Sequence, residues 1–414
     1  MSEHEEKIKK KKKVMIDTEG TMMSIPVHLS LTGDDAPGHN EHSYDLQGPL
    51  CWKCNGCGEV KKKKKKCTVC EGVGRLKPKR KIIESRTKPG RITKCRGGPK
   101  PGPKPRGNPK NIKELNPQMG EELCCLVGSW RIFQCIGGHR YSTEDVVTSY
   151  LAGRSIRNAS KQDPTFRVTN YLDLGTGIGS VLQMVTWQLL QTKYSRDVVS
   201  CVGVEAQKKS AAMARRSILY NGVEGQCRVV HGDIRSFDEN FCNKETKKYA
   251  LITGTPPYFK IEFDPKTKTS RCVQGSLPSA AQSAPARCEF RGGVEVYCAA
   301  ASKHLCSKNK HARFIVCEGG LMFNRERAQK GANEFGLEIL SRVDVIPKMG
   351  KKILFSVYEM ALKSNKDAKP TMINATDTKT RRDGDIYVQT ITVRDGSGDR
   401  TKEYTSLLSE MGMN

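Results

Sequence analysis

Between residues 170 and 362, short apolar runs alternate with amphipathic segments, and this alternation constrains the fold more than any other feature of the sequence. Amphipathic segments such as 207–222 have the spacing of helices, and this one stops at Asn221 and Gly222. Strands that alternate with helices form parallel sheets covered on both faces. We therefore predict an α/β fold with a mostly parallel sheet and helices on both faces. The apolar runs lie at 170–174, 198–206, 226–234, 249–255 and 312–320, and 337–347 and 351–362 close the region as a pair.

A glycine-rich turn, "LDLGTGIGS", follows the first apolar run. Asp173 leads Gly175, Gly177 and Gly179, and glycine lets a backbone approach a ligand closely. The G-x-G-x-G spacing is tighter than the G-x-G-x-x-G of dinucleotide sites. With its leading acid, the turn resembles the first motif of class I S-adenosylmethionine (SAM) methyltransferases. The resemblance implies a Rossmann-like fold with a seven-stranded sheet, and SAM as the cofactor.

The same resemblance assigns roles to the acids that end the first three strands. Asp173 would organise the turn and reach the methionine ammonium, often through water. Glu205 ends the second strand, where an acid would bind the two ribose hydroxyls. Asp233 and Ile234 end the third, where a side chain would accept a bond from adenine N6 and an apolar residue would cover the ring.

A rigid corner, Thr255-Pro256-Pro257-Tyr258, ends the fourth strand and leads into Phe259. It resembles the (Asn/Asp/Ser)-Pro-Pro-(Tyr/Phe) motif of methyltransferases that modify an exocyclic or amide nitrogen. In that motif the first side chain and the first proline carbonyl hold the two N–H protons, and the aromatic ring stacks on a flipped-out base. Thr255 departs from the commoner Asn or Asp but can still accept a hydrogen bond. The alternative is a structural Pro-Pro corner without chemistry.

Residues 120–362 resemble the bacterial tRNA adenine-N6 methyltransferases that act beside the anticodon of valine tRNA. The segments that carry this resemblance are the Thr-Pro-Pro-Tyr corner, 128–153, 286–305 and 339–360. By similarity, Tyr141, Ser142 and Asp145 lie over the methionine end of SAM. Arg287 and Arg291 would meet substrate phosphate, or they are solvated surface arginines.

The N-terminal part of the chain is strongly basic. Of a net charge of +27, the segment 51–110 contributes 21 Lys and Arg against three Glu, a surplus of 18. Such a single-sign field attracts phosphate backbones, although a solubilising or nuclear-import tail is the alternative. The segment 88–110 is rich in Pro, Gly and Lys with few apolar residues, so we predict a disordered linker there, and a disordered tail at 1–46.

Two CxxC pairs lie inside this basic region. Each half reads CxxCxGxG and resembles the cysteine-rich repeat of DnaJ-type chaperones, although the chain has only two repeats and no J-domain His-Pro-Asp. Four thiolates at this spacing predict one Zn²⁺ site; free thiols are the alternative. Six lysines, 61–66, fill the loop between the pairs and would contact nucleic acid phosphates. The predicted zinc ligands are Cys51, Cys54, Cys67 and Cys70.

These features predict a SAM-dependent adenine-N6 methyltransferase that acts on RNA, with tRNA the favoured partner. A protein glutamine methyltransferase and a non-catalytic RNA-binding protein remain the alternatives. The lack of a signal peptide, of an apolar run of eighteen residues and of a disulfide-like cysteine pattern predicts an intracellular protein in a reducing compartment, nucleus or cytoplasm, without excluding an organelle. The predicted domains are a tail at 1–46, a zinc module at 47–80, a linker at 81–115, the methyltransferase at 116–364 and an extension at 365–414.

Overall fold

The structure is a computed structural model, and it divides into two compact units. One unit comprises residues 89–135, 140–256 and 294–414, and we call it the sheet unit. The other comprises 1–88, 136–139 and 257–293. The structure describes residues 88–95, 100–191, 199–237, 248–261, 286–319, 326–373 and 380–413. It also describes the backbone of the short paired strands β1 (Val14–Ile16) with β2 (Met22–Ser24), β3 (Glu59–Val60) with β4 (Lys65–Lys66), and β12 (Ile261–Asp264) with β13 (Thr269–Cys272).

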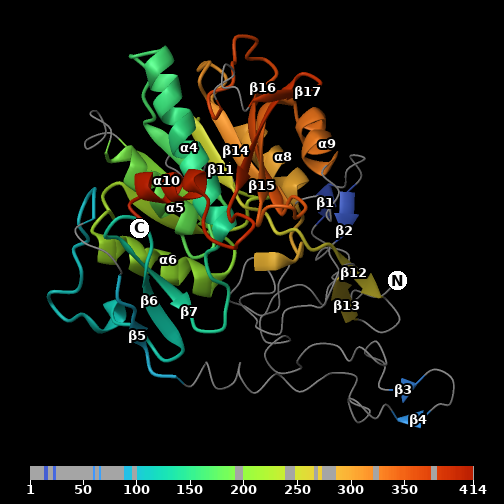
Figure 1. Cartoon of the computed structure of the whole chain (residues 1–414). Coiled ribbons are helices and arrows are strands. Elements are labelled where there is room, and N and C mark those ends of the chain that lie inside the picture. Colours follow the sequence, from blue (N-terminus) through green and yellow to red (C-terminus); the bar gives the residue numbers. More distant parts are fainter. Residues whose placement is uncertain are drawn as a thin grey trace, which may run out of the picture. The chain divides into compact units, whose positions relative to one another are not determined.

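A nine-stranded mixed sheet forms the centre of the sheet unit, in the order β10-β9-β8-β11-β14-β16-β15-β18-β17 (Figure 1). The first five strands are mutually parallel, and β16 lies antiparallel between β14 and β15. The α/β prediction is confirmed. The strands are β8 (Asn170–Leu174), β9 (Ser200–Glu205), β10 (Cys227–His231), β11 (Leu251–Gly254), β14 (Arg313–Gly319), β15 (Leu337–Ile346), β16 (Phe355–Leu362), β17 (Arg381–Asp383) and β18 (Ile386–Thr392).

The order of the parallel strands is that of a Rossmann sheet up to its fifth strand. In chain order β10-β9-β8-β11-β14 reads 3-2-1-4-5. A Rossmann sheet continues with a parallel sixth strand beside the fifth. Here the last strand of the region, β16, is inserted antiparallel at that place, and β15 lies outside it.

Helices cover both faces of the sheet. Tyr297 and Cys298 of α8 and Ala328 and Ala332 of α9 are buried in the cluster that also holds Leu172 of β8. Figure 1 shows α4 and α5 on the opposite side of the sheet from α8 and α9. The helices are α4 (Thr143–Gln162), α5 (Ser180–Leu189), α6 (Lys208–Asn221), α8 (Val294–His304), α9 (Glu326–Glu334), α10 (Lys402–Glu410) and the 3-10 turn η2 (Lys113–Leu115). Within the described part of the chain, no helix has the length and apolar character to cross a membrane.

The C-terminal extension enlarges the sheet beyond the seven strands that the sequence predicts. β18 pairs in parallel with β15, from Ser341 opposite Tyr387 to Ile346 opposite Thr392, and β17 pairs with β18. The free edge of β15 offers unpaired backbone groups, and the extension satisfies them. The expected seven-stranded sheet therefore becomes a nine-stranded one.

Part of the segment 88–110, which the sequence predicts to be a disordered linker, pairs with a neighbouring strand. β5 (Arg91–Ile92) joins β6 (Glu121–Cys125) and β7 (Arg131–Cys135) in a small sheet, and Cys95 forms a disulfide with Cys125. The sequence predicts free thiols in a reducing compartment, so this bond is a second difference. A segment too polar to bury a core of its own is ordered here because it pairs with a neighbouring strand.

Candidate cofactor and transfer site

The residues predicted to bind the cofactor end successive parallel strands. Parallel strands place their carboxyl ends at one edge of the sheet, where ligands bind in open α/β folds. The register sets Leu174 of β8 opposite Val204 of β9 and Gly254 of β11, and Glu205 opposite His231 of β10. Asp173, Glu205, Asp233 and Thr255 therefore gather at the same edge of the sheet unit.

The three glycines of the turn have a backbone conformation that other residues rarely adopt. Gly175, Gly177 and Gly179 have φ values of 62°, 58° and 83°, in the left-handed region where side chains are strained. Gly179 caps the N-terminus of α5. A Cβ at Gly177 would meet no described atom within 4 Å, so the turn leaves room for a ligand there.

Asp173 is a buried carboxylate at the end of β8. It is 1 % exposed and accepts hydrogen bonds from the hydroxyls of Thr176 (2.5 Å) and Thr253 (2.6 Å). Burial raises the pKa of Asp173 to about 7, and the negative charge of Asp145 contributes to the rise. Since two carboxylates interact in a buried region, a cationic ligand group would be stabilised there.

Glu205 links the second strand to the glycine turn. Its carboxylate accepts hydrogen bonds from the backbone N–H of Gly177 (2.8 Å) and of Gln207 (2.6 Å). Gln207, which caps α6, is 4 % exposed, and its side-chain oxygen has no hydrogen-bond partner among the described residues. A buried polar atom usually has a partner, so Gln207 is a further candidate ligand contact that sequence reasoning missed. Its position two residues after Glu205, at the end of the second strand, could have marked it as a candidate from the sequence.

The third strand ends at an ion pair. Both carboxylate oxygens of Asp233 accept bonds from the guanidinium of Arg235, at 2.8 and 2.5 Å. Ile234 is half-buried against the main apolar cluster. A ligand amine at Asp233 would therefore share the carboxylate with Arg235.

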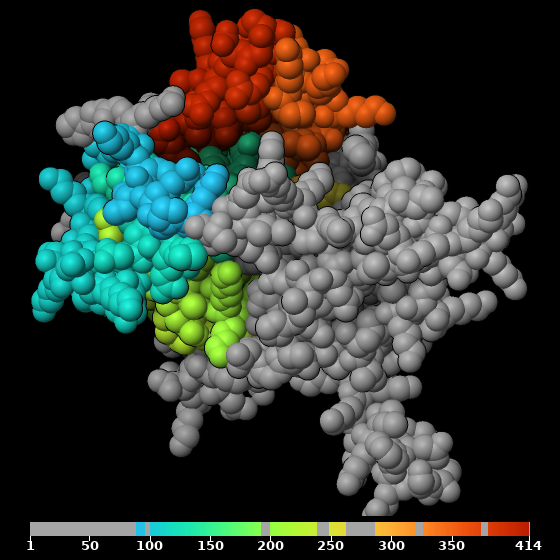
Figure 2. Space-filling view, turned by 90° about the horizontal axis from the view of Figure 1, so that it is seen from below, coloured from blue at the N-terminus to red at the C-terminus, as the bar shows by residue number. Residues whose placement is uncertain are grey.

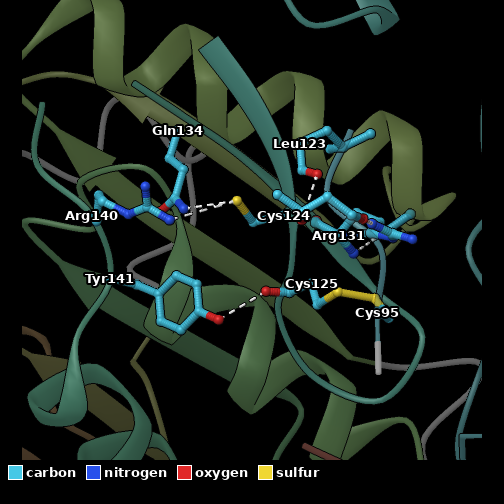
Figure 3. Close-up of a disulfide and its surroundings, with 10 residues drawn as sticks. Cys95, Leu123, Cys124, Cys125, Arg131, Gln134, Arg140 and Tyr141 are labelled. Carbon is cyan, nitrogen blue, oxygen red and sulfur yellow. Dashed lines mark hydrogen bonds between the residues drawn. A yellow bond between two sulfur atoms is a disulfide. The ribbon is translucent and has the colours of Figure 1, made fainter. Parts of the chain in front are cut away.

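Tyr141, Ser142 and Asp145 make bonds within the protein at the start of α4. Asp145 closes a capping box with Ser142, whose N–H donates to it at 2.9 Å, and it accepts a bond from Ser180 at 2.6 Å. The Tyr141 hydroxyl donates to the carbonyl of Cys125 at 2.8 Å (Figure 3). Because Ser180 directly follows the glycine turn, Asp145 joins α4 to that turn.

The residues predicted to bind substrate lie mostly in the second unit. Thr255 and Pro256 belong to the sheet unit, whereas Pro257, Tyr258, Phe259, Arg287 and Arg291 belong to the other. There, the N–H of Phe259 donates to the carbonyl of Arg287 at 3.0 Å, and the Arg287 guanidinium lies 5.7 Å from the centre of the Phe259 ring. The structure thus joins these two side chains by a cation–π contact.

The predicted zinc ligands, Cys51, Cys54, Cys67 and Cys70, lie outside the described residues. Among those that are described, no group of three or more His, Cys, Asp or Glu side chains is placed to hold a metal ion.

Tyr297 is a further candidate residue that the sequence did not reveal. An ideal Cβ at Gly175 would lie 2.1 Å from the Tyr297 hydroxyl, and one at Gly254 would lie 2.6 Å from the ring. Tyr297 comes from α8 and is 7 % exposed. Its ring therefore packs directly on Gly175 of the glycine turn and on Gly254, the residue before Thr255, and no local pattern in α8 marks it.

We expect Gly254→Ala to destabilise the protein by about 1–3 kcal/mol, because the new methyl group overlaps the Tyr297 ring. In a Tyr297→Ala background the same change should cost much less, and urea denaturation of the double-mutant cycle measures the difference. Equal costs in both backgrounds would show that Tyr297 does not pack there.

No protein-family model and no curated protein matches this chain. Several solved structures with a similar fold are methyltransferases. A type I restriction-modification methyltransferase subunit from Streptococcus thermophilus shares 15 % identity over 61 % of this chain, with a TM-score of 0.36, and the match spans 51 % of that subunit. A SAM-dependent methyltransferase from Agrobacterium tumefaciens shares 12 % identity over 59 % of this chain and 70 % of its own, with a TM-score of 0.34. Similarity at this distance concerns the fold alone.

Proposed function

We propose that this protein is a SAM-dependent methyltransferase that modifies the N6 amine of adenine in RNA, with tRNA the favoured substrate. The observation that carries the proposal is the coupled turn at the sheet edge. There, Glu205 accepts a bond from Gly177 while buried Asp173 lies one residue before the glycines. A Rossmann-like order with an antiparallel strand inserted beside the fifth strand supports the same fold family.

The residues present fit SAM. The carboxylates of Asp173 and Asp145 favour the methionine ammonium, and Glu205 would accept from the ribose hydroxyls. Ile234 and Asp233 would meet the adenine ring, and Gly177 leaves space beside the turn. When bound, SAM supplies an electrophilic methyl group on a sulfonium.

The chain's own contribution to transfer is to orient the target amine. An aryl amine is a poor nucleophile because its lone pair is delocalised into the ring. The Thr255 hydroxyl and the Pro256 carbonyl would accept its two N–H bonds and favour a more tetrahedral nitrogen, while Tyr258 would stack on the base. The cyclic backbone of proline fixes the direction of that carbonyl.

We propose that the CxxCxGxG module binds one Zn²⁺ and helps to hold the RNA. The short hairpin of β3 and β4 lies between the two CxxC pairs, as expected if both pairs bind one metal ion. We expect metal analysis of protein purified without chelator to find one zinc per chain. Cys67→Ser should release the metal, because three ligands hold structural zinc poorly. Wild-type protein without zinc would contradict this.

The substrate class is tested by incubating the protein with labelled SAM and separate fractions of RNA, DNA and protein. We expect label in RNA as N6-methyladenine. Label in a glutamine amide would favour a protein methyltransferase. Binding of SAM with no labelled fraction would favour a non-catalytic RNA-binding protein.

A further inference from the structure

A basic strap, defined here as residues 89–95 and 100–113, runs along the sheet unit. It contains seven Lys or Arg residues and no Asp or Glu. Figure 2 shows the blue and cyan atoms of this part of the chain at the molecular surface. Its cations are Arg91, Lys94, Lys100, Lys104, Arg106, Lys110 and Lys113.

The first part of the strap is held by the small sheet. Arg91 pairs with Glu122 in the parallel register of β5 and β6, and the Thr93 N–H donates to the carbonyl of Leu123 at 3.0 Å. The disulfide from Cys95 to Cys125 lies just beyond this pairing (Figure 3). These contacts fix residues 91–95 against the body of the unit.

The second part is held by close packing and by a backbone bond. Gly102 has a φ of 81°, and a Cβ there would lie 2.6 Å from the ring of buried Trp187, so the strap passes in contact with α5. The Gly107 N–H donates to the carbonyl of Tyr220 in α6 at 2.8 Å. The Asn108 carboxamide accepts from the N–H of Ile112 at 2.7 Å, which closes the turn before η2.

Two of the strap's cations are paired with acids of the same unit. Arg91 lies 2.6 Å from Glu122, and Arg106 lies 2.5 Å from Glu224. Lys94, Lys104, Lys110 and Lys113 are exposed to solvent. These four lysines add positive charge to a surface rather than neutralise a buried acid.

The neighbouring helix extends the same charge. α6 contains no acidic residue, and its solvent-exposed cations are Lys208, Lys209 and Arg215. Arg216 is instead paired with Glu121 at 2.8 Å, and its guanidinium also donates to the carbonyl of Glu114, the residue after the strap, at 2.6 Å. The strap and the exposed cations of α6 thus form one cationic surface. α6 begins shortly after Glu205 in the chain.

We infer that the strap and α6 bind the phosphate backbone of the RNA substrate and hold it in a fixed position relative to the cofactor edge. This inference rests on the proposed RNA methyltransferase function. Lysines on a docked backbone lose less entropy on binding than lysines on a free tail, so each phosphate contact should contribute more. A membrane-binding segment would need an apolar face with aromatic or leucine anchors, and the strap has only Ile92 and Ile112 exposed.

The test replaces four strap lysines by glutamine, K94Q, K104Q, K110Q and K113Q, in the full chain. A matched control removes the same charge from exposed lysines elsewhere on the sheet unit, K351Q, K352Q, K363Q and K366Q. Binding of unfractionated tRNA is measured as a function of salt, together with SAM binding and the thermal unfolding temperature.

We expect the strap variant to bind tRNA about tenfold more weakly, with a salt slope reduced by about 0.7–0.9 for each phosphate that the variant no longer neutralises. The control variant should match the wild type, and SAM binding and unfolding temperature should be unchanged in both. If both variants bind tRNA alike while the wild type methylates RNA, the strap inference is wrong and the proposed function stands. If the wild type binds no tRNA, the strap inference is wrong, and if it also methylates no RNA, the proposed function is wrong as well.

Discussion

Replacing Thr255 by Val is expected to slow methyl transfer by about 100-fold or more, with SAM affinity little changed. Valine keeps the shape of threonine and removes the hydroxyl that would accept an N–H bond from the target amine. That factor corresponds to about 2.7 kcal/mol of transition-state stabilisation, at about 1.36 kcal/mol per tenfold change in rate. Thr255→Asn should be tolerated or even faster, because it restores the commoner acceptor. Single-turnover assays with saturating RNA and SAM measure the chemical step.

The chain offers a matched control two residues earlier. The Thr253 hydroxyl donates to Asp173 at 2.6 Å and lies 2.6 Å from the Tyr171 hydroxyl, beside the proposed cofactor site. Thr253→Val should therefore weaken SAM binding, whereas Thr255→Val should weaken transfer. If Thr255→Val transfers methyl groups as fast as the wild type, the Pro-Pro corner is structural and has no part in the chemistry.

Asp173→Asn is expected to weaken SAM binding by about 10- to 100-fold. Hydrogen bonds and ion contacts to a charged group contribute about 1.5–3 kcal/mol each, and asparagine carries no charge for the ammonium. Burial raises the pKa of Asp173 to about 7, so the wild-type affinity should rise with pH up to that value and then level off. Calorimetry between pH 5.5 and 8.5 should show this rise in the wild type and not in Asp173→Asn.

Raising the pH across the pKa of Asp173 should lower the stability of the folded protein, whereas it should raise the affinity for SAM. A raised pKa means that the folded protein binds the proton more tightly than the unfolded chain, whose pKa is near 3.8. The contribution of Asp173 to the free energy of unfolding is full below pH 3.8 and is lost as the pH rises to about 7. The cofactor-free protein should therefore become less stable from pH 5 to pH 8, and Asp173→Asn should lack this part of the decline.

For the binding experiment, a SAM affinity of Asp173→Asn equal to that of the wild type would contradict the proposed place of Asp173 in the cofactor site.

Local patterns in the sequence were sufficient to predict the positions of several strands and helices of the sheet unit. The run at 170–174 is β8, and the helix predicted to stop at Asn221 and Gly222 does so, with Gly222 at a φ of 74°. The three glycines after Asp173, singled out from the sequence, all have positive φ values. Such features depend on residues that are neighbours along the chain. A short apolar run indicates a buried strand, and a glycine adopts a backbone conformation that other residues do not.

Contacts between distant segments were not predictable in this way. The Tyr297 ring packs on Gly175 and Gly254, and Arg287, for which the sequence left a solvated surface position open, makes a cation–π contact with Phe259. The second part of the strap, 100–113, has few apolar residues, yet Gly102 packs against Trp187 and the Gly107 N–H donates to the Tyr220 carbonyl.

The sequence alone determined the alternation of strands and helices, the glycine turn and the acids at the strand ends, because each is encoded by residues adjacent in the chain. Only the tertiary structure decided the strand order, the addition of β18 to β15, and the bond from Gly177 to Glu205. Those features depend on which distant backbone groups and side chains meet. That choice is set by packing and by satisfying buried hydrogen bonds over the whole unit, which no single segment specifies.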